Sequence, residues 1–454
     1  MCLSGEQSLY RRFGVKVESV RGMRDILPEE TPLWQRLEAQ IRTTFALYGY
    51  REIRVPLVER VELFSRGVGE ETDVVDKQMY VFPDRKGLQL ALRPEATASV
   101  VRAFVEHGMH GTGDLTKLYY LGPMFRYEKP QLGRQRQFHQ YGVEALGSLD
   151  PALDAEVMDV SAYLMEKLGL DRTRLTLRLN SIGCRQDREP YREALRLHFL
   201  PGASELCPDC QRRLAENPLR ILDCKRPQCQ SAIVAAPKSL DYVCQDCRDH
   251  FSQVQDFVEA LSIRYELDHT LVRGLDYYTR TVFELSSEDL GAQDALLGGG
   301  RYDDLVEILG GPPTPAVGFA GGMERLVLLL ETPTTHQERR MADLDVYVIP
   351  VGDDPRARIE AATILTRLRQ AGFASDAEYK GRSLRKAMQA AGGRARYAVL
   401  VGSDELAAGK AKVKDLATGD TSEISFSLFS DHGALRELFP QELASTPDPS
   451  EGRA

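Results

Sequence analysis

The chain has 454 residues, which is too long for one compact core and predicts two or three domains. Its 43% hydrophobic and 28% charged residues are typical of a globular protein, and no apolar run approaches the roughly 20 residues of a membrane span. The net charge of −9 argues against bulk coating of nucleic acid but is compatible with local basic patches. Residues 1–19 lack the apolar core of a signal peptide, so we expect a cytoplasmic protein without membrane contact.

The first part of the chain predicts a helix, two strands and a second helix. Residues 1–19 are expected to form a loosely ordered lead-in, followed by an amphipathic helix that begins near Thr31 and ends at Gly49. A hairpin across the segment PDRKG leads into a helix that starts at about Thr97. Glu95 lies where the strand meets this helix, so it is either a functional side chain or an acid that suits the helix dipole.

The stretch LYYLGPMFRYEKPQLGRQRQFHQYGVEALG predicts two strands joined by a basic loop. Alternate side chains share one face of a strand, so the first strand presents Arg126 and Glu128 together, and Gln140 and Glu144 flank Gly142 on the second. Because glycine has no side chain, we expect a slot there for a small polar ligand. The alternative is a surface hairpin with ordinary charges, although such hairpins usually keep charge off the core face and use two-residue turns.

The remainder predicts an interrupted first domain and a separate second one. A charged, cysteine-rich and helical segment at 184–257 interrupts a region of strands and indicates an insertion within a domain at 20–330. We expect the glycine-rich segment LLGGGRYDDL to form a turn. A polar linker at 331–341 precedes a β-α-β pattern at 342–443, which predicts a small α/β domain with a largely parallel sheet. The tail at 444–454 is expected to be disordered.

Six of the eight cysteines lie between Cys207 and Cys247, as CPDC, CKRPQC and CQDC. Two CxxC pairs suit a tetrahedral zinc site, although the gap between them is long. The favoured ligands of this possible structural Zn²⁺ are Cys207, Cys210, Cys244 and Cys247. Cys224 and Cys229 are alternates that would replace one pair, and six reduced cysteines without metal are the competing interpretation. Cys2 and Cys184 are interpreted as incidental.

A basic run in the second domain indicates a phosphate-rich partner. The segment from Lys380 to Arg396 carries six basic residues and no acid. A solvated helix face is the alternative interpretation.

Five motifs in order resemble those of the histidyl-tRNA synthetases, which are class II aminoacyl-tRNA synthetases. The resemblance covers about residues 20–440, and its motifs are GYREIRVP from Gly49, the FRxE core at Phe125, RGLDYYTRTVFE from Arg273, LGGGRYDDL from Leu297, and GFAGGMER ending at Arg325. It implies an α+β catalytic domain with an antiparallel sheet flanked by helices, a mainly helical insertion and a C-terminal anticodon-binding domain. In this family the first motif builds a homodimer interface. The GGGRY segment lacks the GK[ST] ending of a phosphate-binding P-loop.

The resemblance implies a two-step reaction in which ATP activates L-histidine and the histidyl-adenylate is attacked by tRNA(His). Arg126 would contact the α-phosphate and the substrate carboxylate, Arg273 would act as the catalytic cation, and Arg325 would grip the polyphosphate, since arginine holds oxygens bidentately. Glu128 would contact adenine, and Arg134 and Arg136 the phosphates, with Mg²⁺ bridging the ATP oxygens.

The amino-acid pocket must offer acceptors to an ammonium and partners to an imidazole. The resemblance assigns the ammonium side to Glu95, Ala96, Thr97 and Gln140, and the imidazole to Glu144, Tyr278 and the adjacent Tyr277, with Arg126 and Arg273 nearby. The loop residues Lys129 and Gln131 resemble those that meet the tRNA acceptor end. We hypothesise that this loop reads the extra 5′ guanosine of histidine tRNA. Lys129 departs from the arginine common in relatives and lacks its planar fork.

Three other interpretations remain to be separated from this one. A catalytically silent paralogue, such as the regulatory subunit of ATP phosphoribosyltransferase, typically lacks RGLDYY and the C-terminal domain. A zinc-dependent nucleic-acid-binding module would leave the first 180 or so residues without a role. A synthetase for another amino acid, such as proline, is distinguished by Glu144 and Tyr278.

Overall fold

A computed structural model describes residues 17–69, 72–131, 133–287, 290, 295–330 and 344–440. The chain divides into two compact units, residues 1–330 and 331–454. The predicted linker and tail, and most of the predicted lead-in, lie outside the described residues. Among the described helices, none combines the length and the apolar character needed to cross a bilayer.

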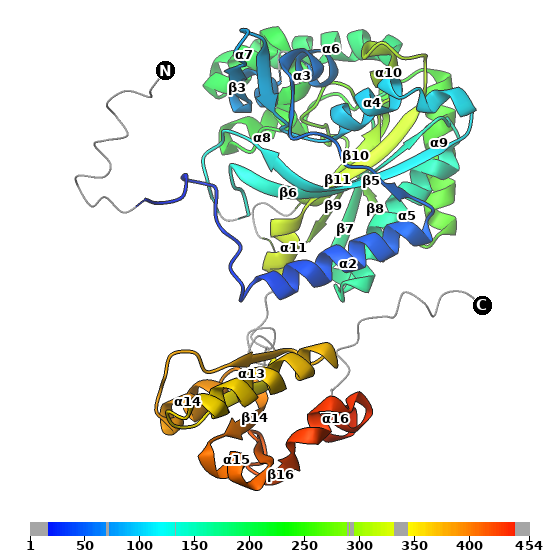
Figure 1. The fold of residues 1–454 in the computed structure, drawn as a ribbon. Helices are drawn as coiled ribbons and strands as arrows, with labels where there is room; N and C mark the ends of the chain where they lie inside the picture. Colours follow the sequence, from blue (N-terminus) through cyan, green and yellow to red (C-terminus); the bar gives the residue numbers. More distant parts are fainter. Residues whose placement is uncertain are drawn as a thin grey trace. The chain divides into compact units, whose positions relative to one another are not determined.

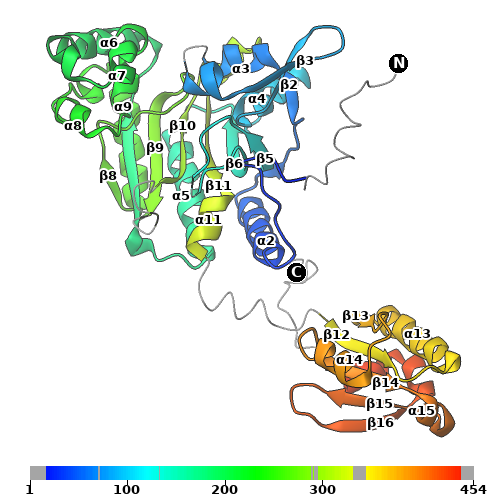
Figure 2. The same ribbon diagram turned by 90° about the vertical axis from the view of Figure 1, so that its left-hand side faces the viewer.

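The first unit is built on an eight-stranded sheet (Figures 1 and 2). Its six inner strands pair antiparallel, and only the outer pairs β1–β5 and β7–β8 are parallel. The predicted antiparallel sheet is therefore confirmed. In spatial order its strands are β1 (Arg51–Glu52), β5 (Thr116–Phe125), β6 (Gln137–Leu146), β11 (Ala316–Gly322), β10 (Ala295–Arg301), β9 (Thr279–Ser287), β7 (Leu175–Ser181) and β8 (Tyr265–Leu267).

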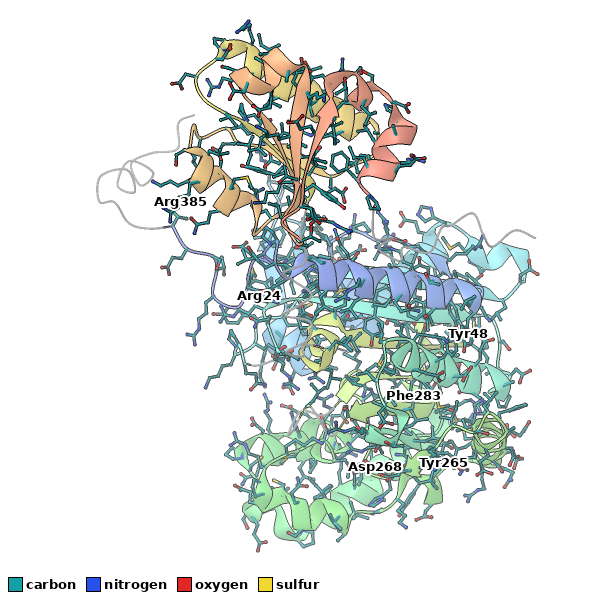
Figure 3. All side chains as sticks on the ribbon, turned by 90° about the horizontal axis from the view of Figure 1, so that it is seen from below. Arg24, Tyr48, Tyr265, Asp268, Phe283 and Arg385 are labelled. Atoms are coloured by element: carbon teal, nitrogen blue, oxygen red, sulfur yellow. The ribbon has the colours of Figure 1, made fainter. Side chains whose placement is uncertain are left out.

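One face of this sheet packs on long helices that bury an apolar core. Figure 1 shows α2 (Thr31–Leu47) and α5 (Pro151–Lys167) lying along it, beside α11 (Met323–Leu330). Trp34, Leu37, Ile41 and Phe45 recur at helical spacing on α2 and are all buried against the strands. Tyr48, labelled in Figure 3, donates its hydroxyl hydrogen to Asp159 at 2.7 Å and so ties α2 to α5.

The opposite face carries shorter elements and forms a second core. They are α3 (Val61–Val68), α4 (Thr97–Glu106), α10 (Leu305–Ile308) and a small sheet of β2 (Val58–Arg60), β4 (Gln89–Leu92) and β3 (Tyr80–Pro83). The predicted PDRKG hairpin is the β3–β4 pair, and the helix expected near Thr97 begins there.

The glycine-rich segment expected to form a turn is instead the strand β10. A Cβ at Gly299 would collide with the Gly318 carbonyl oxygen, and one at Gly298 would collide with the Arg273 guanidinium. The glycines therefore serve close packing within a sheet. A local turn signal cannot be told from this role in the sequence alone.

The insertion is mainly helical. Its helices are α6 (Arg185–Phe199), α7 (Pro208–Glu216), α8 (Pro227–Val234) and α9 (Gln245–Ala260), with 3₁₀ turns at η4 (Leu200–Glu205), η5 (Pro218–Ile221) and η6 (Ser239–Asp241). Figure 2 shows α6, α7 and α8 grouped beyond the β8–β9 side of the sheet.

The second unit is a five-stranded sheet in the order β13-β12-β14-β15-β16. The strands β13, β12 and β14 are parallel, but β14, β15 and β16 pair antiparallel, so the expectation of a largely parallel sheet holds for only part of it. Its elements are β12 (Leu344–Pro350), α13 (Pro355–Gln370), β13 (Ser375–Ala377), α14 (Leu384–Ala391), β14 (Ala395–Val401), α15 (Ser403–Ala408), β15 (Lys410–Asp415), β16 (Thr421–Ser425) and α16 (His432–Leu438).

A buried ion pair joins β10 to α5 in the first unit. The guanidinium of Arg301 is fully buried, and its Nη2 lies 2.7 Å from Oδ2 of the equally buried Asp154. Arg301 also donates to the carbonyl oxygens of Ser148 and Asp150. Removing one partner of such a pair leaves an uncompensated buried charge.

Asp154→Ala is expected to lower the free energy of unfolding of the first unit by about 3–5 kcal/mol, measured by urea denaturation. The matched control is Glu106→Ala, which removes the Arg102–Glu106 pair, whose acid is 60% exposed. That change should cost under about 1 kcal/mol. Equal losses in the two variants would contradict the prediction.

Candidate active site

The sheet face beneath α4 opens into a cavity of about 740 Å³. Residues from the hairpin, from the insertion and from the three strands β9, β10 and β11 line it together. The residues proposed from sequence that line it are Glu95, Thr97, Arg126, Glu128, Arg134, Gln140, Arg273, Tyr277, Tyr278 and Arg325. Residues spread over more than 200 positions of the chain therefore meet at one cavity.

The slot expected beside Gly142 is not open. A Cβ at Gly142 would collide with the Tyr120 hydroxyl and the Phe319 carbonyl oxygen, so Tyr120 fills the space that glycine leaves. Gln140 still lines the cavity, and its Oε1 is buried without a hydrogen-bond donor among the described residues. The ligand space is thus formed beside the strand, between Gln140 and the residues of α4, rather than over the glycine.

Glu144 lies behind the cavity wall, held by two hydroxyls. Its side chain is 1% exposed; Oε1 accepts a hydrogen bond from Thr97 Oγ1 at 2.6 Å, and Oε2 accepts one from the Tyr302 hydroxyl. Burial raises the pKa of Glu144 to about 8, against the hydrogen bonds from Thr97 and Tyr302, which favour the charged form. This carboxyl therefore changes charge near neutral pH.

Glu95 serves the start of α4. Its two carboxylate oxygens accept the backbone N–H groups of Thr97 and Ala98 at 2.8 and 2.9 Å, and Ala96 is fully buried at the N-cap position. Burial raises the pKa of Glu95. Glu95 therefore both stabilises the N-terminus of α4, where a negative charge suits the helix dipole, and lines the cavity.

Three arginines reach the cavity from different elements. Arg126 follows β5; its Nε donates to the Pro94 carbonyl oxygen at 2.9 Å, and its Cζ lies 5.2 Å from the centroid of the Phe138 ring. Arg273 Nη1 lies 2.9 Å from the Glu284 carboxylate, while its Nε is buried without an acceptor among the described residues. Arg325, on α11, donates to the Ala295 carbonyl oxygen.

Of the two arginines in the hairpin loop, Arg134 lines the cavity and Arg136 does not. Arg134 lies 3.7 Å from Glu128, and both line the cavity. Arg136 instead stacks on the exposed Tyr127, with its Cζ 4.1 Å from the ring centroid, and donates to the Glu128 carbonyl oxygen. The structure therefore does not bring Arg136 to the cavity with the other predicted ATP-binding residues.

The predicted tRNA residues lie on the same loop, outside the cavity. Lys129 and Gln131 are both exposed. The backbone of Gln131 pairs with that of Arg134 in a tight turn, with N···O distances of 3.0 and 2.9 Å. This turn holds the Gln131 side chain at the surface beside the cavity.

Sequence reasoning missed several residues that support the site. Tyr302 follows the glycine-rich strand and holds Glu144. Glu284 alternates with the core residue Phe283 on β9, a period-two signal that could have marked it. Asp268 also lines the cavity, and Figure 3 labels it together with the core residue Phe283.

The insertion also closes the cavity, which its sequence does not reveal. Arg213 and Arg220 lie 2.7 and 3.5 Å from Asp73, and Arg220 also donates to the Arg273 carbonyl oxygen. This contact connects the insertion directly to the RGLDYY segment.

The cysteines form two groups that differ from the favoured set of four. Cys207, Cys210, Cys224 and Cys229 lie together and are all buried, whereas Cys244 and Cys247 lie with Cys184 and Asp187. The favoured combination of Cys207 and Cys210 with Cys244 and Cys247 is therefore wrong, and Cys184, interpreted as incidental, lies beside the second pair. The pair that lies beside Cys207 and Cys210 is Cys224 and Cys229 of CKRPQC, because η5 brings that segment back to the start of α7.

In the second unit the basic run surrounds α14. Arg382 and Arg394 are held by Glu378 and Asp376 at 3.3 and 3.2 Å. Arg385, labelled in Figure 3, lies on α14 itself. Acidic residues just outside the run therefore orient some of its cations.

An antiparallel sheet on which Arg126 and Arg325 converge at one cavity is the architecture of a class II aminoacyl-tRNA synthetase. The family model described as histidyl-tRNA synthetase matches residues 22–326, and that described as anticodon binding domain matches residues 345–432. The chain belongs to the histidyl-tRNA synthetase family.

Curated relatives and solved structures agree with this assignment. A histidine–tRNA ligase of Halothermothrix orenii is 48% identical over 409 residues, covering 90% of this chain and 96% of that relative. One from Synechococcus sp. is 50% identical over 404 residues, with coverage of 89% and 95%. The crystal structure of apo S. aureus histidyl-tRNA synthetase aligns with a TM-score of 0.74 at 36% identity, covering 94% of this chain and all of that one.

A structure described as an ATP phosphoribosyltransferase regulatory subunit/histidyl-tRNA synthetase from Bacillus halodurans C has a TM-score of 0.60. It is only 23% identical and shows the fold alone. The match to the anticodon-binding domain, together with the RGLDYY segment at the cavity, argues against the silent paralogue.

Proposed function

We propose that the chain activates L-histidine with ATP, forming histidyl-adenylate and pyrophosphate, and then transfers histidine to the 3′ end of tRNA(His). The observation that carries this proposal is the pairing of two arginines with a polar pocket in one cavity. Arg126 and Arg273 supply positive charge where a carboxylate must approach a phosphate. Beside them, the unpartnered acceptor Gln140 Oε1 suits the ammonium of an amino acid.

The imidazole would be recognised through the Glu144 group. Tyr277 and Tyr278 line the cavity with ring centroids 4.7 Å apart, and Glu144 lies behind them with Thr97 and Tyr302. A pocket that hydrogen-bonds polar atoms rejects analogues that lack them by large factors. Selection of histidine would therefore need no separate editing site.

ATP would lie along the hairpin. Glu128 and Arg134 line the cavity together with Arg126, and Arg325 of α11 lines it as well, so three cations are available to a triphosphate chain. Mg²⁺ would be held mainly by the phosphate oxygens, and the carboxylates at the cavity, among them Glu128, Asp223 and Asp268, offer the oxygen ligands that it prefers. The arginines would orient the two anions in line and offset their repulsion.

ATP–pyrophosphate exchange, run with each amino acid in turn, tests the proposal. Exchange is expected with histidine and with no other amino acid, because the pocket selects by hydrogen bonding. Proline is the informative comparison, since it has no side chain able to engage Glu144. Absence of exchange with histidine would overturn the proposed function.

We also propose a division of labour along the chain. Residues 20–330, with the insertion at 184–257, would carry the chemistry, and residues 342–443 would bind the anticodon arm of tRNA through the basic run around α14. A homodimer would form at the β1 edge of the sheet. Leu57 and Val58, which follow β1 within a few residues, support it by exposures of 43% and 39%.

Gln131→Ala is expected to lower kcat/KM for tRNA charging about tenfold and to leave ATP–pyrophosphate exchange unchanged. The reason is that Gln131 is exposed on the loop outside the cavity, where loss of a contact to one base costs about 1–3 kcal/mol. Charging is measured with transcripts that carry or lack the 5′ guanosine. The variant should lose its preference between them, and equal loss of charging and exchange would refute the role.

A further inference from the structure

The four cysteines Cys207, Cys210, Cys224 and Cys229 have the geometry of a metal centre. Their Sγ atoms all lie within 4.8 Å of one another, and the side chains are at most 7% exposed. The Cys207 and Cys224 Sγ atoms are 3.8 Å apart. Zinc bound tetrahedrally with Zn–S distances of about 2.3 Å requires S···S separations of about 3.8 Å. Four mutually close sulfurs fit one tetrahedral ion better than two separate disulfides, in which each sulfur has a single partner at about 2 Å.

The surrounding backbone also favours thiolates. The N–H of Cys207 donates to Cys229 Sγ at 3.3 Å, and the N–H of Arg226 donates to Cys224 Sγ at 3.4 Å. Cys207 is the N-cap of α7, and Cys229 lies in the first turn of α8, so the positive ends of two helices face the sulfurs. Such second-layer donors stabilise and orient metal-bound thiolates.

The cluster lies directly behind one wall of the catalytic cavity. Cys224 stands between Asp223 and Lys225, which both line the cavity together with Leu222 and Arg220. Arg220 contacts the Arg273 carbonyl oxygen, so this wall touches the segment that carries the catalytic cation. The cysteines pin Cys224 to the starts of α7 and α8 and thereby fix the position of the wall.

We propose that Cys207, Cys210, Cys224 and Cys229 bind one Zn²⁺ ion, which positions the wall of the catalytic cavity from Leu222 to Lys225. The ion touches neither substrate nor the reacting atoms. The ligand atoms of Cys184, Asp187, Cys244 and Cys247 are also within 4.8 Å of one another, but this second group has three thiols rather than four. Its fourth member, Asp187, already accepts the backbone N–H groups of Cys184 and Cys244 at 3.0 Å, one on each carboxylate oxygen. The second group therefore provides a matched control.

Metal analysis of the purified full-length chain tests the site without reference to activity. The double variant Cys224→Ser/Cys229→Ser should lose one zinc equivalent per chain, and Cys244→Ser/Cys247→Ser should retain that equivalent. Cobalt-loaded wild-type protein should show the intense visible bands of a tetrahedral tetrathiolate, absent from the first variant. Wild-type zinc content in the first variant, or loss of that equivalent in the second alone, would overturn the site.

The wild-type protein provides a test that does not depend on the variants folding. Titration with an organomercurial should release one zinc ion as four protected thiols react, followed with a chromogenic zinc chelator. Zinc release that does not track thiol modification would contradict a cysteine site.

The positioning role rests on the proposed function and has its own readout. In ATP–pyrophosphate exchange, the zinc-free Cys224→Ser/Cys229→Ser variant should show about a tenfold higher KM for ATP with kcat changed less, because a loosened wall weakens binding more than chemistry. An unchanged KM in a zinc-free, folded variant would overturn the positioning role while leaving the metal site intact. Absence of exchange in the wild type would count against the proposed function alone.

Discussion

Arg126→Ala is expected to reduce kcat/KM for histidine-dependent ATP–pyrophosphate exchange about 10³-fold. Arg126 is held in place by the Pro94 carbonyl oxygen and the Phe138 ring, so its charge is already oriented before substrates bind. Removing one such preorganised group typically costs 10² to 10³ in rate. Arg126→Lys should recover only part of the loss, since lysine retains the charge without the planar fork.

Two controls make this prediction specific. Arg196→Ala removes an arginine paired with Glu189 and Glu193 on the surface of α6, and exchange should be unchanged. The chain has a single tryptophan, Trp34, whose ring packs 5.0 Å from that of His139 on the hairpin, so its fluorescence reports whether the hairpin is intact in each variant. An Arg126→Ala protein with native fluorescence and more than a tenth of wild-type exchange would refute the assignment.

Glu144→Ala should lower kcat/KM for histidine by about 10³-fold in the same assay. The substitution removes the acceptor of two buried hydroxyls, Thr97 Oγ1 and the Tyr302 hydroxyl, and an unpaired buried group costs about 1–3 kcal/mol. It also removes the proposed partner of the imidazole. Tyr302→Phe, which takes away only one of these hydrogen bonds, should lose about tenfold.

The titration of Glu144 gives an independent check through stability. Its pKa is about 8 in the folded chain, whereas an unfolded glutamate ionises near 4.3. Because the folded pKa is raised, the contribution of Glu144 to stability is fully present below about pH 4 and is lost as the pH rises through 8. Between pH 5 and 9 the wild type should therefore lose about 4 kcal/mol relative to Glu144→Gln, which does not titrate, measured by urea denaturation. Parallel pH profiles for the two proteins would show that Glu144 is ionised throughout.

The resemblance carried by the five motifs predicted the antiparallel sheet. Hydrophobic periodicity predicted helices and strands because that pattern depends only on residues close together in the chain. The apolar stripe of α2 and the β5–β6 hairpin are examples. The segment LLGGGRYDDL was wrongly expected to be a turn. Its glycines are required by close contacts with Arg273 and with Gly318 on the neighbouring strand, and both of these residues are distant in sequence. The same limit applies to Gly142, whose vacant space is filled by Tyr120.

The sequence by itself determined the family, through motifs whose residues and order can be read directly along the chain, and the two-unit organisation, through its change of pattern after residue 330. The resemblance to that family supplied ten of the side chains that line the cavity. Only the tertiary structure decided which partners those side chains meet. It placed Tyr302 on Glu144, turned Arg136 away onto Tyr127, and brought Cys224 and Cys229 rather than Cys244 and Cys247 to Cys207. Each of these contacts joins segments whose approach is set by packing of the whole fold, and spacing along the chain carries no information about that approach.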